Sequence, residues 1–217
     1  MKMAPICESQ KYKSPPTTLI PQHYPIEAGV LFAGEYPGDR NPEIARARIL
    51  SLVEMGVRTF IDLTSPNDPL VRYEGMLVEV EQEIGIPLRR ISGPIPDMDV
   101  PDSDDTMLSI MAAIRASIEA VPAVYIHCWG GIGRTGAVVG CWLRECGHDP
   151  EAALAHVQHL YSSHMAKAKA GKYPESPQTE AQKNYVRRWN ITGRPVLGAE
   201  VEFDRACVSP RAEGDES

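Results

Sequence analysis

The sequence predicts an α/β protein with a mainly parallel central sheet flanked by helices and a helical C-terminal part. Three observations support this prediction. Apolar, strand-like segments alternate with segments of helical period between about residues 30 and 128. The segment at 123–128 is apolar on both faces, as a central parallel strand covered by helices should be. Only helical patterns follow that segment.

The first predicted strand is VLFAGEYP at residues 30–37, and a helix follows it. Asn41 suits the cap of this helix, Pro42 fits its first turn, and Glu43 places a negative charge at the positive end of its dipole. Gly56 marks its end. The alternation then continues with a strand, a helix and a strand, at 58–64, 71–84 and 86–92.

The second half of the chain contains four predicted helices and the central strand. A long amphipathic helix at 103–120 begins behind Asp102 or Ser103, and the strand at 123–128 comes next. The later helices are expected at 135–146, from Asp149 and from Ser176.

The 217 residues fit one domain, which we expect at 28–190 between an N-terminal arm at 1–27 and a C-terminal tail at 191–217. Five cysteines without paired spacing argue against a disulfide scaffold, and a net charge of −7 argues against nucleic acid or stable membrane association. No segment reads as a membrane helix or a signal peptide. We therefore expect a cytoplasmic monomer without a metal or another cofactor.

The decapeptide HCWGGIGRTG, His127 to Gly136, lies between the carboxyl end of the central strand and a buried helix, where open α/β sheets bind ligands. Glycines let backbone N–H groups turn inward around an anion, and the helix N-terminus adds its positive end. Arg134 offers a planar fork for two phosphate oxygens. We expect the phosphate to be bound by Trp129, Gly130, Gly131, Ile132, Gly133 and Arg134.

Cys128 lies close in the sequence to the same helix N-terminus and to Arg134. A helix N-terminus and a nearby cation favour the thiolate, which is the nucleophilic form of a cysteine. We therefore predict that Cys128 attacks phosphorus, that Thr135 donates a hydrogen bond to the sulfur, and that His127 orders the loop. A structural reading of Cys128 as a small buried residue is the alternative.

These residues resemble the H-C-x5-R-[ST] signature of the cysteine-dependent protein tyrosine and dual-specificity phosphatases, with every fixed position filled. The resemblance implies the protein tyrosine phosphatase-like fold and a separate Asp that protonates the leaving oxygen. PIPDMDVP at 94–101 is similar to the loop of that Asp in the cyclin-dependent-kinase-associated branch. It implies Asp97 as the general acid and base, with Asp99 as its rival.

The resemblance also implies a Gln that positions the hydrolytic water, near the start of a late helix. Gln178 is the first candidate and Gln182 the second, and a solvent-facing helix start is the alternative for both.

Other glycine-rich sites fit less well. Residues 131–136 also satisfy G-x-G-x-x-G, but a dinucleotide site needs a βαβ unit and here only helices follow. A phosphate loop of the ATPase type needs Lys where Arg134 stands.

The predicted function is hydrolysis of phosphotyrosine in proteins, with phosphoserine or phosphothreonine as further substrates. An inositol-phosphate or phosphoinositide substrate is the alternative, but the loop interior carries no Lys to hold extra phosphates. An inactive phosphopeptide-binding module is the alternative of another class. Such modules typically lose the Cys, Arg or Asp, and all three are present.

Overall fold

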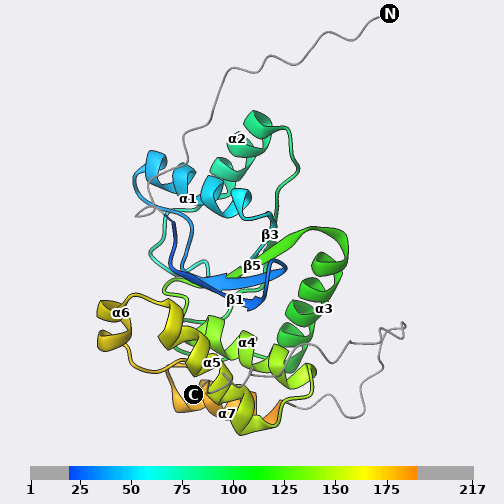
Figure 1. The fold of residues 1–217 in the computed structure, drawn as a ribbon, viewed down its shortest axis with the longest axis vertical. Coiled ribbons are helices and arrows are strands. Elements are labelled where there is room, and N and C mark those ends of the chain that lie inside the picture. Colours follow the sequence, from blue (N-terminus) through cyan, green and yellow to red (C-terminus); the bar gives the residue numbers. More distant parts are fainter. Residues whose placement is uncertain (1–19, 190–217) are drawn as a thin grey trace, which may run out of the picture.

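The computed structural model of the protein describes residues 20–189, which form a mixed sheet between two layers of helices (Figure 1). The described strands are β1 (His23–Glu27), β2 (Leu31–Gly34), β3 (Val57–Asp62), β4 (Arg89–Ser92) and β5 (Ala123–His127). Their spatial order is β1-β2-β5-β3-β4. β5 is central and pairs in parallel with β2 and β3, as its apolar sequence predicted.

The three middle strands, β2, β5 and β3, end at the same level. Gly34 of β2 and Asp62 of β3 both lie opposite His127 of β5. The segments that leave these strands therefore meet at one edge of the sheet, where Cys128 follows β5 directly. The sheet thus places the predicted phosphate loop between the ends of its two neighbouring strands.

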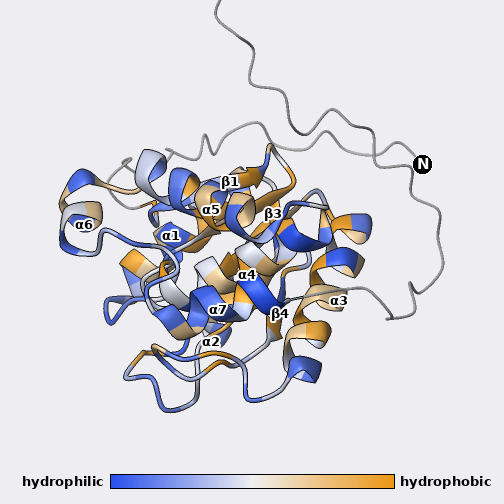
Figure 2. Ribbon diagram, turned by 90° about the horizontal axis from the view of Figure 1, so that it is seen from below, coloured by the Kyte–Doolittle hydropathy of each residue, from blue (hydrophilic) through white to orange (hydrophobic). Residues whose placement is uncertain are grey.

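Two groups of helices cover the two faces of the sheet (Figure 1). α1 (Pro42–Glu54) and α2 (Glu74–Ile84) pack on one face. The opposite face is covered by α3 (Asp104–Ala120), α4 (Gly133–Glu145), α5 (Pro150–His164) and α7 (Glu180–Arg188), and α6 (Lys167–Lys172) follows α5. Figure 2 shows that the exposed helices carry hydrophobic and hydrophilic residues on different sides.

Local signals in the sequence set several helix ends. Asn41, Ser103 and Asp149 cap α1, α3 and α5, and each accepts a hydrogen bond from a backbone N–H in the first turn. Gly85 ends α2 in the left-handed conformation, with a φ of 66°. These signals confirm the predicted starts of α1, α3 and α5 and the predicted end of α2.

The structure corrects the prediction at its N-terminal end. β1 lies within residues 1–27, which we had assigned to an arm, so the strand predicted at 30–37 is the second one. β1 runs antiparallel to β2 at the sheet edge, where Pro25 is tolerated because an edge strand needs fewer N–H donors. Buried Tyr24 attaches it to the core.

Two further corrections concern the C-terminal helices. The last helix begins at Glu180 rather than at Ser176, because Thr179 and Gln182 form its capping box. Ser176 instead packs across the phosphate loop, where its hydroxyl donates to the carbonyl oxygen of Ile132. α6 was not predicted, since its sequence KAKAGK lacks an apolar period.

No helix among residues 20–189 is both long and apolar enough to cross a membrane.

Candidate active site

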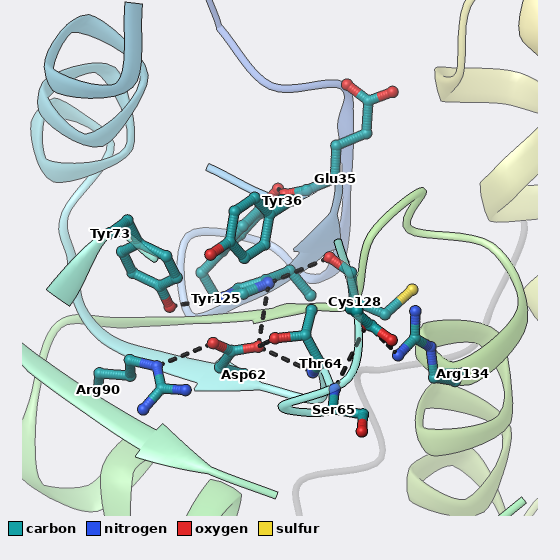
Figure 3. Close-up of polar contacts among 12 residues, drawn as sticks. Glu35, Tyr36, Asp62, Thr64, Ser65, Tyr73, Arg90, Tyr125, Cys128 and Arg134 are labelled. Carbon is teal, nitrogen blue, oxygen red and sulfur yellow. Dashed lines mark hydrogen bonds and ion pairs between the residues drawn. The ribbon is translucent and has the colours of Figure 1, made fainter. Parts of the chain in front are cut away.

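The predicted phosphate loop lies between β5 and α4, with Cys128 at its start and Arg134 in the first turn of the helix. Both side chains are almost completely buried, at 3% and 2% exposure. Figure 3 shows the Cys128 sulfur pointing toward the guanidinium group of Arg134. The structure thus brings together the two residues on which the sequence prediction depends.

The carbonyl groups of the loop are turned outward by hydrogen bonds from surrounding elements. The donors are the Leu63 N–H to His127, the His127 ring to Cys128, the Tyr36 N–H to Trp129, the Lys169 ammonium to Gly130, and the Ser176 hydroxyl to Ile132. In a trans peptide the next N–H points away from the carbonyl. The N–H groups of the loop therefore face the opposite side, as an anion site requires.

Gly131 makes the tightest approach within the loop. Its φ is 69°, and an added Cβ would lie 2.4 Å from the carbonyl carbon of Gly34. A side chain at this position would be strained and would collide with the end of β2.

Arg134 is held by two acids and a carbonyl group from two other segments, the turn that contains Asp68 and the predicted acid loop. Its Nη1 donates to Oδ2 of Asp68 at 2.6 Å and to the carbonyl oxygen of Ile95 at 3.2 Å, and its Nη2 lies 2.8 Å from Oδ1 of Asp97. Burial alone would lower the pKa of Arg134, but the negative charges of Cys128, Asp68 and Asp97 raise it. The guanidinium is therefore charged and fixed beside the sulfur.

His127 lies beneath the loop, completely buried. Its Nε2 is 2.7 Å from the Tyr73 hydroxyl, and its Nδ1 is 3.3 Å from the carbonyl oxygen of Cys128. Burial lowers the pKa of His127, against the opposing charge of Asp62, and burial raises the pKa of Tyr73. We therefore assign a neutral ring whose Nδ1–H donates to Cys128 while Nε2 accepts from Tyr73. This supports the predicted ordering role of His127.

Asp62 is a buried carboxylate at the end of β3, and Figure 3 shows it between Arg90 and Thr64. It accepts hydrogen bonds from the Thr64 N–H and hydroxyl and from Nε of Arg90, and lies 3.8 Å from Nδ1 of His127. Burial favours a raised pKa, but His127, Thr64 and Arg90 together lower the pKa of Asp62. The charge of this carboxylate is therefore balanced before any ligand binds.

The predicted acid loop reaches the same site from β4. Its Asp97 side chain is 51% exposed and meets Arg134, while Met98 has a φ of 61° and is also exposed. The rival Asp99 instead accepts a hydrogen bond from the N–H of Val100. Of the two acids, Asp97 is the one that the structure brings to Arg134.

The two candidate glutamines differ in their contacts. Both ends of the Gln182 amide have partners, because its oxygen accepts from the N–H groups of Gln178 and Thr179 and its nitrogen donates to the Asp99 carbonyl oxygen. The side chains of both glutamines lie beside Gly133, but of the two only Gln178 lines the cleft above the loop. The geometry therefore separates a glutamine that anchors the acid loop from one that faces the site.

Thr135 is completely buried behind Arg134. Its hydroxyl oxygen makes no hydrogen bond with any other residue in the range 20–189. The hydroxyl is available to a group in the site.

A cleft of about 740 Å³ opens above the loop. Four exposed apolar side chains line it: Val71, Met98, Trp129 and Tyr173. Arg40, Arg48 and Lys169 add positive charge to its wall, and Glu35, Asp39 and Asp97 add negative charge.

Comparison with known proteins identifies the family. A sequence model of the family described as "Tc-R-P: Polymorphic toxin system, DSP-PTPase phosphatase" matches residues 37–148. The chain belongs to this family. It is therefore a member of the cysteine-dependent tyrosine and dual-specificity phosphatase superfamily that the signature at 127–135 resembles.

One curated relative is the "Putative tyrosine phosphatase 067L" of Invertebrate iridescent virus 3, 26% identical over 159 residues. The match covers 71% of this chain and 62% of that protein, so the chain spans less than two thirds of the relative's length.

Solved structures with the same fold include Tk-PTP in its active form and PTPMT1 in complex with PI(5)P. Tk-PTP has a TM-score of 0.57 and 23% identity, over 78% of this chain and 96% of its own. PTPMT1 has a TM-score of 0.55 and 15% identity, over 77% of this chain and 94% of its own. These likenesses confirm the predicted phosphatase-like fold.

Sequence reasoning missed the residues that support Arg134 and the loop from outside it, which are Asp62, Asp68, Tyr73, Lys169 and Ser176. Asp68 lies in SPNDP, which reads as an ordinary polar turn. Asp62 gave the clearer signal, because an acid at the end of a buried strand needs partners. The other three belong to segments far from the loop in the sequence.

Proposed function

We propose that this chain hydrolyses phosphotyrosine in proteins, and phosphoserine or phosphothreonine more slowly, through a phosphocysteine on Cys128. The observation that carries the proposal is the pairing of the Cys128 sulfur with the buried, charged Arg134 at a loop whose carbonyls are turned outward. Such a loop presents N–H donors to the phosphoryl oxygens without reorganisation.

In the first step, the Cys128 thiolate attacks phosphorus and the bond from phosphorus to the leaving oxygen breaks. Arg134 stabilises the equatorial oxygens, and Asp68 keeps its guanidinium in place. Asp97 gives its proton to the leaving oxygen, because its carboxyl group lies 2.8 Å from Nη2 of Arg134 and so beside the bound phosphate.

In the second step, a water attacks the phosphocysteine, and Asp97 takes its proton. The bond from sulfur to phosphorus breaks, which releases inorganic phosphate and the thiolate. Gln178 positions the water, since it faces the cleft, and the Thr135 hydroxyl hydrogen-bonds the departing sulfur. His127 acts from below the loop and transfers no proton.

The cleft supports an aromatic substrate. Val71, Met98, Trp129 and Tyr173 offer apolar surface around the loop, which suits the ring of phosphotyrosine. The likeness to PTPMT1 in complex with PI(5)P favours a phosphoinositide as the second candidate substrate. The interior of the loop has no charged residue other than Arg134 to hold further phosphates.

The test is a comparison of wild type with Cys128→Ser on three substrates: an aryl phosphate, a phosphotyrosine peptide and PI(5)P. We expect wild type to release phosphate from the first two and Cys128→Ser to release none while still binding inorganic phosphate. Rapid quenching of wild type should trap one acid-labile phosphate per chain. Turnover by Cys128→Ser would contradict the mechanism. A preference of wild type for PI(5)P would indicate a phosphoinositide substrate instead of a phosphoprotein. An inactive wild type that binds phosphopeptide would indicate a binding module.

A further inference from the structure

The Gly130 carbonyl differs from the other outward-facing carbonyls of the loop in its donor. His127 and Trp129 are held by backbone N–H groups of neighbouring strand ends, and Ile132 by the buried hydroxyl of Ser176. Gly130 is held by the charged side chain of Lys169, which lies on α6, 39 residues along the chain. The donor at this peptide is therefore a side chain from a short, distant helix.

The Lys169 ammonium is itself held in place. Its Nζ lies 2.5 Å from the carbonyl oxygen of Gly130 and forms an ion pair with Oε1 of Glu35, and its side chain is only 14% exposed. The other oxygen of Glu35 accepts from the N–H of Gln22 at 3.0 Å, and the Gln22 amide oxygen accepts from the N–H of Ala166 at 2.8 Å. This network connects the start of β1 and the end of β2 to the start of α6.

The peptide between Gly130 and Gly131 is the one in the loop most able to rotate, because both of its residues are glycines. Rotation would turn the Gly130 carbonyl toward the phosphate and the Gly131 N–H away from it. An anion would then face a carbonyl oxygen instead of a donor. The φ of 69° at Gly131 belongs to the present orientation of this peptide, because rotation of the peptide changes the ψ of Gly130 and the φ of Gly131.

We propose that Lys169, oriented by Glu35, is a positioning residue that holds the Gly130 carbonyl outward and so keeps the Gly131 N–H directed at the phosphate. The proposal rests on the proposed function, since it concerns the site that receives the phosphoryl group. Lys169 acts through the loop backbone and does not bind the phosphate itself.

The first test measures the affinity of inorganic phosphate by calorimetry in the full chain carrying Cys128→Ser. Adding Lys169→Met should weaken binding by about tenfold, the cost of one lost charge-assisted hydrogen bond that orders a site. Lys169→Arg should recover part of the affinity, because it keeps a charged donor. Lys167→Met is the matched control, since it removes the same charge from the same helix without a contact to the loop, and should bind as the parent does.

Glu35→Gln separates positioning from direct attraction. Loss of a negative charge near the site would tighten phosphate binding if Lys169 attracted the anion directly. Positioning predicts weaker binding, because the ammonium loses the partner that aims it at Gly130. Tighter binding in Glu35→Gln, or unchanged binding in Lys169→Met, would overturn the proposal.

The second measurement follows the Gly131 amide proton by NMR at saturating phosphate. In the Cys128→Ser parent we expect a downfield shift on binding, and in Lys169→Met we expect that shift to be lost while other loop amides keep theirs. A full Gly131 shift in Lys169→Met would also contradict the proposal. If the parent itself binds no phosphate, the proposed function fails. If the parent binds phosphate and Lys169→Met binds it equally well, only the proposed role of Lys169 fails.

Discussion

The phosphate loop and the acid loop meet at Arg134 but are built in opposite ways. Cys128 and Arg134 are nearly fully buried, and four carbonyls between Cys128 and Ile132 accept hydrogen bonds from groups outside the loop. The Asp97 side chain is half exposed and its neighbour Met98 is exposed, with the left-handed φ of 61°. The residues proposed to bind the phosphate are thus buried and held by many contacts, whereas the residue proposed to transfer the proton lies on an exposed segment.

The attachment of the acid loop explains how an exposed segment still reaches the site. The Ile95 N–H donates to the Leu63 carbonyl oxygen, and the Gln182 amide nitrogen donates to the Asp99 carbonyl oxygen. Asp97 lies between these two anchors, and its own side chain contacts only Arg134 among the described residues. The loop is fixed on both sides of the acid, while the acid keeps access to solvent.

The largest effect expected from this contrast is on turnover. Asp97→Asn should lower kcat for a phosphotyrosine peptide by about 10²–10⁴-fold, the usual contribution of a general acid. Phosphate affinity should not fall, because the substitution removes a negative charge beside Arg134. Steady-state kinetics and phosphate inhibition measure the two quantities. Asp99→Asn is the control and should retain wild-type turnover; an equal loss there would transfer the role to Asp99.

Arg134→Lys tests the fixed side of the contrast. It should lower kcat/KM by about 10²–10³-fold, as expected for a lost donor to the transition state, and weaken phosphate binding as well. A lysine cannot hold two phosphate oxygens with a planar fork while its single nitrogen also donates to Asp68 and Ile95. Arg90→Lys, which changes a guanidinium that contacts Asp62 outside the loop, should cost much less. Similar losses in the two variants would mean that Arg134 stabilises the folded structure rather than binds the phosphate.

Asp68→Asn is expected to have an intermediate effect. The amide still accepts from Nη1 of Arg134 but lacks the charge, so kcat/KM should fall by about tenfold, in line with a charge-assisted bond made neutral. Because Asp68 does not reach the substrate, the loss should be the same for a small aryl phosphate and a phosphopeptide. A decrease in kcat/KM for the phosphopeptide alone would show that Asp68 contacts the peptide instead.

The smallest effect concerns stability and pH. The pKa of His127 in the folded chain is below its ordinary 6.5, so the unfolded chain binds the extra proton first as pH falls. Stability should therefore decrease from pH 6.5 downward until the lowered pKa of His127 is passed. The pKa of Asp62 is lowered from 3.8, so its stabilising contribution is present at pH 5 and is lost only as the pH falls below about 3.8. Partial burial and His148 also lower the pKa of His156. The two proteins to be compared, the parent and its His127→Gln variant, should therefore both carry His156→Gln.

In that background, the Tm of the parent should fall between pH 7 and pH 5, and His127→Gln should show a smaller fall. The measurement is thermal unfolding at matched ionic strength. An equal fall in both proteins would mean that His127 does not titrate differently in the two states.

The sequence by itself determined the elements and the chemistry that depend on neighbouring residues. Asn41, Ser103 and Asp149 cap their helices with their own side chains, and the short apolar run at 123–126 indicated a covered strand. The spacing from Cys128 to Arg134 identified the loop because all of its parts are contiguous.

Only the tertiary structure decided what surrounds that loop. Asp68, Tyr73 and Lys169 come from three segments whose local sequences resemble an ordinary turn, a helix start and a polar surface helix. Their contacts exist because parallel pairing brings the ends of β2, β5 and β3 level, and because α6 returns to that same edge. Contacts between distant segments depend on which strands pair and on how the helices pack against them, and no single local stretch of sequence specifies either.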